Sequence, residues 1–479
     1  MSLKLIGRKA EQAILRKALA SEEAEMVAVL GRRRVGKTFL VRSVYAGQMA
    51  FEVTGVQYAT TEEQLSNFYF QFTAMLGSGD EFERPTTWME AFQSLIRAWE
   101  RQQFTEKMVL FFDELPWLAT PKSGFLKALS FFWNSWAVKQ SVVVVMCGSA
   151  ASWMIQKVIN DRGGLHNRIT RRLLLQPFTL QEAEQYLHSR HIYLHRYQLV
   201  QLYMALGGIP HYLKEIEAGQ SAAQQIDRIC FAPGGLLRDE FLRLYPALFT
   251  HSERHVAVVR ALAKKWKGLT RKEVVQQARL PEGGSTTRLL EELIHSGFVS
   301  AYYPFGKRKK EQLYRLTDEY SLFYLHFIEN KRVQGQGSWQ HLSQTPVYHS
   351  WSGYAFESLC LKHLDQLKRS LGISGVYTEA ASFYQAATEE EKGLQVDLLL
   401  DRKDQVINFF EMKFYDAPYT LSQATAHAWR DRIARFRRLS RTPKQVTLTL
   451  VTPFGLAEGP HGPGLVDQVI DLDGLFGGD

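Results

Sequence analysis

The chain has 479 residues, more than the roughly 250 to 300 over which a single hydrophobic core grows, so we expect several domains. Hydrophobic residues make up 45% and charged residues 22%, the composition of an ordinary soluble protein. No stretch approaches the roughly 18 consecutive apolar residues of a membrane helix, and the opening MSLKLIGRKAEQ lacks a signal peptide's apolar core. A cytoplasmic protein without a membrane partner is therefore expected. Cys147, Cys230 and Cys360 match no metal-binding or redox spacing.

The formal net charge of the chain is +9, and it is unevenly distributed. Between Arg254 and Arg315 the sequence has 14 Lys and Arg residues against 5 Asp and Glu residues, an excess equal to the net charge of the whole chain. Such a segment favours the docking of a polyanion such as DNA. A well-solvated surface without a partner is the alternative.

The first motif lies between a predicted strand and a predicted helix in MVAVLGRRRVGKTFLVRSVY, which begins at Met26. Its residues fit G-x-x-x-x-G-K-[ST], the pattern of a phosphate-binding loop. In such a loop backbone N–H groups surround the phosphates, Lys37 reaches the β- and γ-phosphates, and Thr38 binds Mg²⁺. ATP and Mg²⁺ are therefore the expected cofactors. The predicted nucleotide-binding residues of the loop are Gly31, Arg32, Arg33, Arg34, Val35, Gly36, Lys37, Thr38 and Phe39.

Two further apolar strands are expected to bring catalytic residues to this loop. The run MVLFF is followed by Asp113 and Glu114. In a P-loop enzyme the Asp holds the Mg²⁺ shell and the adjacent Glu polarises the attacking water. The strand SVVVVMCG is followed by Ser149, whose hydroxyl would sense the γ-phosphate or the water. A cap or turn is the alternative role of this serine.

An arginine-rich segment, GGLHNRITRR, follows the third strand and carries Arg168, Arg171 and Arg172. One of these side chains would act as an arginine finger, neutralising charge on ATP held by the same or a neighbouring subunit. Arg168 is the favoured residue, and a surface salt bridge is its alternative role.

Together these motifs resemble the archaeal-type ATPase family, a branch of the AAA-like, STAND-related P-loop ATPases. The resemblance covers roughly the first 250 residues and also rests on IGRKAE, from Ile6, and LGGIPHYL, from Leu206. It implies a P-loop ATPase core over residues 1–175 and a helical lid over residues 176–250. It further implies that the nucleotide base lies near Gly7, Arg8 and Glu11.

The basic middle segment, residues 251–333, has the pattern of a winged helix-turn-helix. Three short predicted helices precede two predicted strands, AYYPF and EQLYRL, which are joined by GKRKK. The third helix has the recognition position and the joining loop is the wing, so both are expected to contact duplex DNA. A lid or a protein contact is the alternative. The predicted DNA-binding residues are Thr286, Thr287 and Arg288 on the helix and Lys307, Arg308, Lys309 and Lys310 on the wing.

The segment QGQGSWQHLSQTP is rich in Gly, Ser and Gln, so it predicts a linker before a last domain over residues 345–479. That domain has the predicted order α-β-β-β-α-β, with Asp397, Glu411 and Lys413 at neighbouring strand ends. It resembles the PD-(D/E)xK nuclease superfamily. The resemblance implies that Asp397 and Glu411 share Mg²⁺ with a scissile phosphate, while Lys413 orients or deprotonates water. Glu357, on the preceding helix, would complete the metal shell.

The predicted fold class is thus multidomain α/β, with a P-loop NTPase core, a helical lid, a winged helix-turn-helix and a restriction-endonuclease-like domain. The predicted function is a Mg²⁺-dependent ATPase that acts on or at nucleic acid, with nuclease activity left open. The alternative is a nucleotide-dependent regulatory, defence or toxin–antitoxin switch whose last domain binds a partner without cleaving it. The sequence leaves open DNA versus RNA, and a homo-oligomer versus a partner protein.

Overall fold

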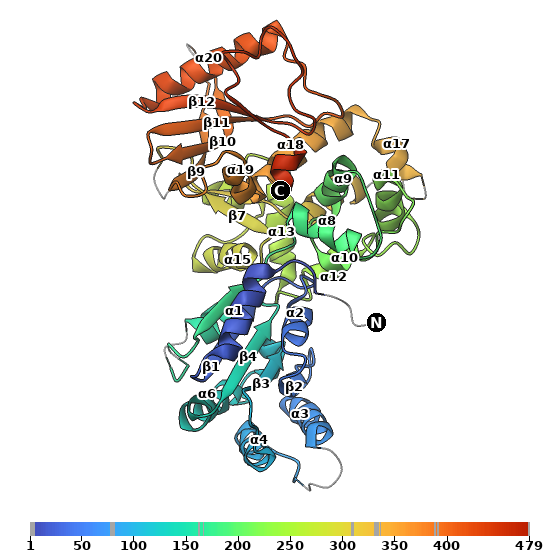
Figure 1. Cartoon of the computed structure of the whole chain (residues 1–479), viewed down its shortest axis with the longest axis vertical. Coiled ribbons are helices and arrows are strands. Elements are labelled where there is room, and N and C mark those ends of the chain that lie inside the picture. Colours follow the sequence, from blue (N-terminus) through green and yellow to red (C-terminus); the bar gives the residue numbers. More distant parts are fainter. Residues whose placement is uncertain are drawn as a thin grey trace. The chain divides into compact units, whose positions relative to one another are not determined.

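The computed structural model describes residues 5–76, 82–160, 163–165, 167–307, 311–329, 335, 337–387, 389 and 392–477 (Figure 1). The chain divides into two compact units. The first comprises residues 1–177 and 291–297, and the second comprises residues 178–290 and 298–479. No helix in the described ranges combines the length and the apolar character needed to span a membrane.

The first unit is built around a five-stranded parallel sheet with the strand order β2-β3-β4-β1-β5. Figure 1 shows β1, β3 and β4 side by side in this sheet. These three strands are buried along almost their whole length, which is why their sequences are continuous apolar runs rather than alternating ones. The strands are β1 (Glu25–Leu30), β2 (Met49–Thr54), β3 (Met108–Asp113), β4 (Val142–Gly148) and β5 (Arg171–Leu174).

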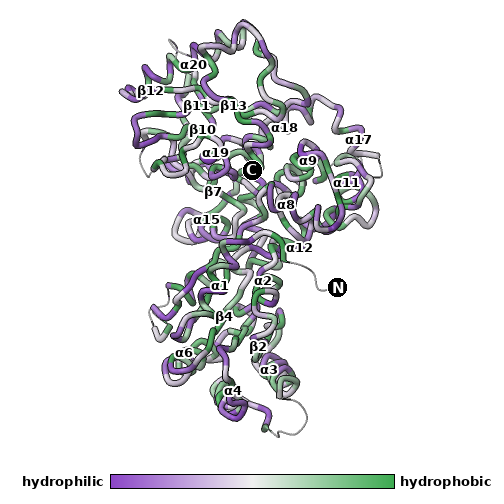
Figure 2. Tube along the Cα trace, viewed as in Figure 1, coloured by the Kyte–Doolittle hydropathy of each residue, from purple (hydrophilic) through white to green (hydrophobic). Residues whose placement is uncertain are grey.

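Aromatic side chains fill the core between this sheet and its helices. The ring of Trp88 meets that of Phe125 edge to face at 4.7 Å, and Phe92 lies 4.9 Å from Phe132. Buried apolar positions alternate with exposed charged positions along α4, so it has one apolar face (Figure 2). The helices of this unit are α1 (Lys9–Ala20), α2 (Lys37–Val44), α3 (Thr61–Leu76), α4 (Trp88–Gln102), α5 (Leu115–Leu118), α6 (Phe125–Ser135), η1 (Ala137–Lys139), α7 (Ala151–Met154) and η2 (Ile155–Ile159).

The second unit begins with short helices in the region predicted as a lid. Several of them start at the capping residues that the sequence offers: Thr179 and Ser221 each form a complete capping box with the residue three positions later. The helices are α8 (Leu180–His188), α9 (Arg196–Leu206), α10 (Pro210–Leu213), α11 (Ala222–Ile226), η3 (Asp227–Phe231) and α12 (Glu240–Leu244).

The middle segment contains the predicted helices and a small antiparallel sheet of order β6-β8-β7. Residues 291–297, at the end of α15 and just after it, are counted with the first unit. The winged-helix assignment of the whole segment stays a prediction. The elements are α13 (Ser252–Ala263), β6 (Leu269–Thr270), α14 (Arg271–Gln277), α15 (Gly284–His295), β7 (Val299–Tyr302), β8 (Leu313–Leu316), α16 (Glu319–Phe323) and η5 (Tyr324–Ile328).

The C-terminal part has a mixed five-stranded sheet of order β13-β12-β11-β10-β9. Strands β9, β10 and β11 are antiparallel neighbours, whereas β11, β12 and β13 are parallel. Phe436 of α20 packs on this sheet, 5.1 Å from Phe383 and 5.9 Å from Phe409. The elements are α17 (Ser338–Leu342), α18 (Pro346–Lys362), α19 (Leu364–Ser370), β9 (Thr378–Gln385), β10 (Leu394–Arg402), β11 (Val406–Met412), α20 (Gln423–Ser440), β12 (Gln445–Val451), β13 (Gln468–Ile470) and α21 (Leu472–Phe476).

The described part of the predicted linker is packed into the second unit, so that interpretation was wrong. The carboxylate of Asp227 accepts hydrogen bonds from the backbone N–H groups of Gly337, at 2.6 Å, and Trp339, at 2.8 Å. Trp339 is only 2% exposed, and its ring lies 4.9 Å from Phe323 and 5.0 Å from Phe327. One tryptophan in a polar run supplies enough apolar surface to anchor the segment.

The predicted domain boundaries are only partly visible in these units. The first unit ends at Pro177, two residues after the predicted end of the ATPase core. The lid, the middle segment apart from residues 291–297, and the C-terminal part fall together into the second unit. Their division into three domains stays a prediction.

Candidate functional site

The phosphate-binding loop connects β1 to α2 and requires glycine at two positions. A Cβ atom on Gly31, whose φ is 147°, would lie 2.5 Å from the carbonyl oxygen of Leu175. Gly36 precedes α2 with a φ of 92°, which L side chains rarely adopt. Lys37 is 5% exposed, and its ammonium donates hydrogen bonds to the carbonyl oxygens of Gly31 (2.9 Å) and Arg32 (3.0 Å). The lysine charge is therefore held inside the loop.

Thr38 and Asp113, which are 75 residues apart in sequence, meet beside this loop. Although β4 lies between β1 and β3, Thr38 Oγ1 donates a hydrogen bond of 2.7 Å to Asp113 Oδ2. The backbone N–H of Glu114 donates to the other oxygen, Asp113 Oδ1, at 3.0 Å. Parallel strands end at one edge of the sheet, which is why the loop and the acids converge.

Ser149 contacts the candidate catalytic carboxylate. Its hydroxyl and its backbone N–H both donate to Glu114 Oε2, at 2.8 Å and 3.0 Å. Glu114 itself has a φ of 45°, a left-handed conformation that is uncommon outside glycine. The predicted contact of Ser149 with a phosphate or water stays a prediction, because the bonds found here run to Glu114.

The N-terminal motif lies against the phosphate-binding loop. Arg8 is 4% exposed, its Nη2 donates to the carbonyl oxygen of Val35 at 3.4 Å, and its Nη1 lies 4.0 Å from Glu11 Oε1. Gly7, with a φ of 63°, accepts a hydrogen bond from Gln12 Nε2 at 2.7 Å. Proximity of this motif to a nucleotide base stays a prediction.

The remaining loop residues and the arginine candidates differ in exposure. Arg32 and Val35 are buried, Arg33 and Arg34 are half-buried, and Phe39 is exposed. Arg171 forms an ion pair with Glu25, at 3.0 Å, within the first unit. Arg172 is exposed, as is Arg168, which forms no ion pair within the described residues. An arginine-finger role in the same or a neighbouring subunit therefore stays a prediction for Arg168.

The donor set of this site fits a nucleotide with Mg²⁺. A buried ammonium lies next to backbone N–H groups at the start of α2, the combination that binds phosphates. Thr38 and Asp113 offer hydroxyl and carboxylate oxygens, the hard donors that Mg²⁺ prefers. Lys37 would bind phosphate oxygens, and Thr38 and Asp113 would hold the metal or its water shell.

One of the DNA-binding residues predicted on the recognition helix, Thr286, is buried in the structure, so that prediction was wrong. Thr286 is 2% exposed, and its Oγ1 donates a hydrogen bond of 2.7 Å to the carbonyl oxygen of Pro281, so it cannot contact a base. A threonine beside the start of a helix satisfies a local carbonyl instead. Thr287 is exposed and accepts a bond from Arg271 Nε at 3.3 Å, and Arg288 is also exposed.

The base of the predicted wing is attached to the C-terminal sheet. The backbone N–H of Phe305 donates to the carbonyl oxygen of Ser382 on β9 at 2.6 Å. Its ring lies 5.7 Å from that of Phe436. Lys307 pairs with Glu311 at 3.4 Å. The other three wing residues, Arg308, Lys309 and Lys310, lie outside the described residues.

The C-terminal hairpin places the predicted acids on adjacent strands. The paired register of the two strands ends at Leu399 opposite Phe409, and β10 has an irregularity between Val396 and Leu399. The charge of Asp397 still acts on Glu411. Asp397 Oδ1 accepts a hydrogen bond of 2.6 Å from Gln395 Nε2. Glu411, which is 4% exposed, lies 3.6 Å from Lys413 Nζ. It also pairs with Arg432 of α20.

The electrostatics of this cluster disfavour ionised carboxylates. Burial raises the pKa of Glu357 to about 8, and the charge of Asp397 adds to the increase. Burial also raises the pKa of Glu411, although Arg432 and Lys413 oppose the increase. Within the described ranges, no group of three or more His, Cys, Asp or Glu residues is arranged to hold a metal ion. Metal binding by Asp397, Glu411 and Glu357 stays a prediction.

Sequence reasoning missed Arg432. The segment AWRDRIARFRRLSR predicts an Arg-rich helix, but nothing in the spacing of its arginines distinguishes the one that meets Glu411. Besides Glu411, Arg432 binds the carbonyl oxygen of Gln395 at 2.6 Å. Only the packing of α20 on the sheet shows this contact.

Comparison with known proteins identifies the N-terminal part. Residues 5–216 match the family described as "ATPase domain predominantly from Archaea". This part of the chain is similar to archaeal-type ATPase domains. The match confirms the predicted resemblance, although it ends before residue 250, and it covers the first unit up to residue 177 and the second as far as α10. The nuclease-like assignment lies beyond it.

Several proteins of known sequence or structure are similar to this chain. The uncharacterised protein MJECL04 of Methanocaldococcus jannaschii is 21% identical over 416 residues, which cover 86% of this chain and 88% of that protein. The Walker-type ATPase PABY2304 of Pyrococcus abyssi is 18% identical, with 67% and 96% of the two chains covered and a TM-score of 0.48. The ORC2 protein of Aeropyrum pernix in its ADPNP–ADP complexes is 14% identical, with 71% and 96% covered and a TM-score of 0.43.

Proposed function

We propose that this protein hydrolyses ATP with Mg²⁺ and acts on or at nucleic acid. The observation that carries the ATPase proposal is the meeting of Thr38, Asp113 and Glu114 beside the buried Lys37. The nucleic-acid proposal is supported by the excess of nine positive charges between Arg254 and Arg315.

Each residue of the ATP site has a separate proposed role. Lys37 leaves the carbonyl oxygens of its own loop and binds phosphate oxygens. Thr38 and Asp113, which now hydrogen-bond to each other, supply oxygen ligands for the metal. Glu114 orients and polarises the attacking water, and Ser149 holds the carboxylate of Glu114 in place. When bound, Mg²⁺ neutralises the charge of the transferred phosphoryl group.

Substitutions of Lys37 and Glu114 separate binding from hydrolysis. We expect Lys37→Ala to abolish ATP turnover and weaken ATP binding, because the phosphates lose their buried cation. Glu114→Gln should still bind ATP but hydrolyse it at least about a hundredfold more slowly, since the amide cannot act as a base. Phosphate release and binding of a fluorescent ATP analogue measure the two effects.

A matched control for these variants is Lys9→Ala, which removes an exposed lysine from α1 and should retain both properties. Wild-type turnover in Lys37→Ala or in Glu114→Gln would show that the assigned residues do not carry the reaction.

A second candidate activity is metal-dependent cleavage of DNA by the C-terminal domain. It is favoured by the closeness of the Asp397 charge to Glu411 and by the position of Lys413, 3.6 Å from Glu411. Two carboxylates, here those of Asp397 and Glu411, suffice to bind Mg²⁺, because this ion keeps several of its water ligands. Before it can bind the metal, Glu411 must break its ion pair with Arg432.

The alternative for this domain is a regulatory role in which it binds a partner without cutting nucleic acid. It is favoured by the ion pairs of Glu411 with Lys413 and Arg432, because a carboxylate neutralised by two cations can have a purely structural role. The cleavage assay on Lys413 described in the Discussion distinguishes the two.

A further inference from the structure

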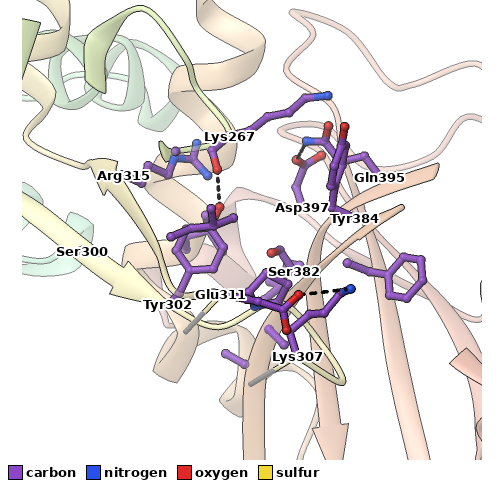
Figure 3. Close-up of a pocket in the computed structure, with 18 of the residues that line it drawn as sticks. Lys267, Ser300, Tyr302, Lys307, Glu311, Arg315, Ser382, Tyr384, Gln395 and Asp397 are labelled. Atoms are coloured by element: carbon purple, nitrogen blue, oxygen red, sulfur yellow. Dashed lines mark hydrogen bonds and ion pairs between the residues drawn. The ribbon is translucent and has the colours of Figure 1, made fainter. Parts of the chain in front are cut away.

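The second unit contains a cavity of about 1050 Å³ whose walls come from two parts of the chain. Figure 3 shows Arg315, Tyr302 and Lys267 on the side of the middle segment. Tyr384 and Asp397 lie on the side of the C-terminal sheet. This volume lies at the upper end of the range of about 300 to 1,000 Å³ that ligand pockets occupy, so it has room for one or more nucleotide units.

Two cations in this cavity are not neutralised by ion pairs. Lys265 pairs with Glu273 at 2.7 Å, and Lys307 pairs with Glu311. Lys267, in contrast, forms no ion pair with a described residue, and its ammonium lies 5.8 Å from the centre of the Tyr384 ring. The cavity therefore presents available positive charge beside an aromatic face.

Arg315 is the second such cation. It is 7% exposed, and its Nη2 donates a hydrogen bond of 2.7 Å to Ser358 Oγ. Its Nε has no hydrogen-bond partner. The side chain of Glu357 is near enough to feel its charge, but no carboxylate in the described part of the chain lies within ion-pair distance of it. A buried guanidinium with an unsatisfied donor is costly unless an anion completes it.

The aromatic wall suits a nucleobase. Tyr384 is 50% exposed although it lies on β9, so its ring is accessible for stacking. Tyr302 is fixed on the facing wall, because its hydroxyl donates to the carbonyl oxygen of Lys267. Proteins bind single-stranded nucleic acid with cationic side chains that contact the phosphates and with aromatic rings on which the bases stack. This cavity has both features side by side.

We propose that this cavity binds nucleotide units of single-stranded nucleic acid, with phosphates on Lys267 and Arg315 and a base stacked on Tyr384. The inference rests on the proposed action at nucleic acid and adds the place and the form of the ligand. A single strand is favoured over a duplex because its unpaired bases are free to stack on an accessible ring such as that of Tyr384. Asp397, on the opposite wall, repels phosphates and so orients the strand toward the cations.

The test measures the binding of a short, fluorescently labelled oligothymidylate to the full-length protein by fluorescence anisotropy at several salt concentrations. EDTA is present to prevent metal-dependent cleavage. We expect Tyr384→Ala to weaken binding roughly tenfold and Tyr384→Phe to retain it, because stacking needs the ring and not the hydroxyl. Lys267→Glu should reduce the slope of log affinity against log salt by about 0.7 for each phosphate that the variant no longer neutralises.

The matched control is Lys272→Glu, the same charge reversal at an exposed lysine on α14 that does not line the cavity. It should bind the oligonucleotide nearly as the wild type does. Competition with duplex DNA and with thymidine monophosphate distinguishes a strand from the other sources of phosphate and base.

Each other result would overturn either the proposed binding site, the single-strand assignment or the proposed action at nucleic acid. If the wild type binds the strand but the Tyr384 and Lys267 variants bind equally well, the cavity is not the site and the proposed function stands. If duplex or the mononucleotide competes as strongly as the strand, the single-strand assignment is wrong. If the wild type hydrolyses ATP but binds no nucleic acid, both this inference and the proposed action at nucleic acid are wrong.

Discussion

At the scale of single residues, the ion pairs of Glu411 allow the role of Lys413 to be tested by substitution without unfolding the protein. Glu411 is a buried carboxylate with two cationic neighbours, Lys413 and Arg432. Removing one partner of a buried pair is usually strongly destabilising, because a charge is left uncompensated. Here Arg432 remains when Lys413 is removed, so the carboxylate keeps a partner.

We therefore predict that Lys413→Ala stays folded while losing any nuclease activity. With Mg²⁺ or Mn²⁺, DNA cleavage should fall at least about a hundredfold, since the variant lacks the group that orients or deprotonates water. Ca²⁺ should support binding without cleavage in the wild type, because it is larger and activates water poorly. The measurement is nicking of plasmid DNA, with and without ATP.

Lys403→Ala, in the turn between β10 and β11, is the control, and it should cut like the wild type. If Lys413→Ala also cuts at the wild-type rate, or if the wild type never cuts, the cluster is structural or binds a partner. The regulatory function then becomes the better description of this domain.

At the scale of elements, short polar segments gain their structure from a few anchors. Helix α17 has five residues, too few to be stable by itself. It is held by Trp339 in an aromatic cluster and by two hydrogen bonds to Asp227. Burial of one ring thus compensates for the weak helix and the flexible composition around it.

Replacing Trp339 with alanine should release this segment. We expect a loss of about 3 to 5 kcal/mol of stability, the usual cost of truncating a buried Trp, and faster proteolysis near α17. Gln340→Ala changes an exposed neighbour on the same helix and should stay within about 0.5 kcal/mol of the wild type. Melting temperature and limited proteolysis report the two effects, and equal protease resistance in both variants would contradict the anchoring role.

At the scale of the whole molecule, the second unit is held together by contacts between distant parts of the chain. His363, at the end of α18, accepts a hydrogen bond at Nε2 from the backbone N–H of Leu180 at 3.0 Å. Its Nδ1–H donates to the carbonyl oxygen of Leu359 at 2.8 Å. The ring must stay neutral for this arrangement, because a protonated Nε2 cannot accept.

This histidine makes the stability of the second unit depend on pH. Burial lowers the pKa of His363 from 6.5 to about 4, and the charge of Lys362 adds to the decrease. Above pH 6.5 the ring is neutral in both states, so there is no penalty. As the pH falls from 6.5 to about 4 the unfolded chain takes up the proton first, and stability falls by at most about 3 kcal/mol.

Unfolding in urea across this pH range, compared between the wild type and His363→Gln, measures the effect. Glutamine can accept the hydrogen bond from Leu180 but gains no proton, so its stability should change less between pH 6.5 and pH 4. The same pH dependence in both proteins would mean that other groups are responsible.

The strands of the ATPase domain and its candidate site residues could be predicted from the order of amino acids. Continuous apolar runs ending in Asp113, Glu114 or Ser149 mark buried parallel strands, and parallel strands bring their ends to one edge. Gly36 of the phosphate-binding loop is needed for its positive φ, which is a local backbone reason. The strand patterns and this loop motif depend on neighbours along the chain, so a single sequence carries them, whereas the close approach of Leu175 to Gly31 is a tertiary contact.

Features that depend on how the elements pack became visible only in the folded molecule. Thr286 is buried, and Glu411 meets an arginine 21 residues later. Trp339 anchors a segment whose composition predicts a linker. The cavity of Lys267 and Tyr384 exists only because β9 faces the middle segment. Burial and ion pairing depend on which surfaces pack against each other. They therefore cannot be predicted from the order of residues along the chain alone.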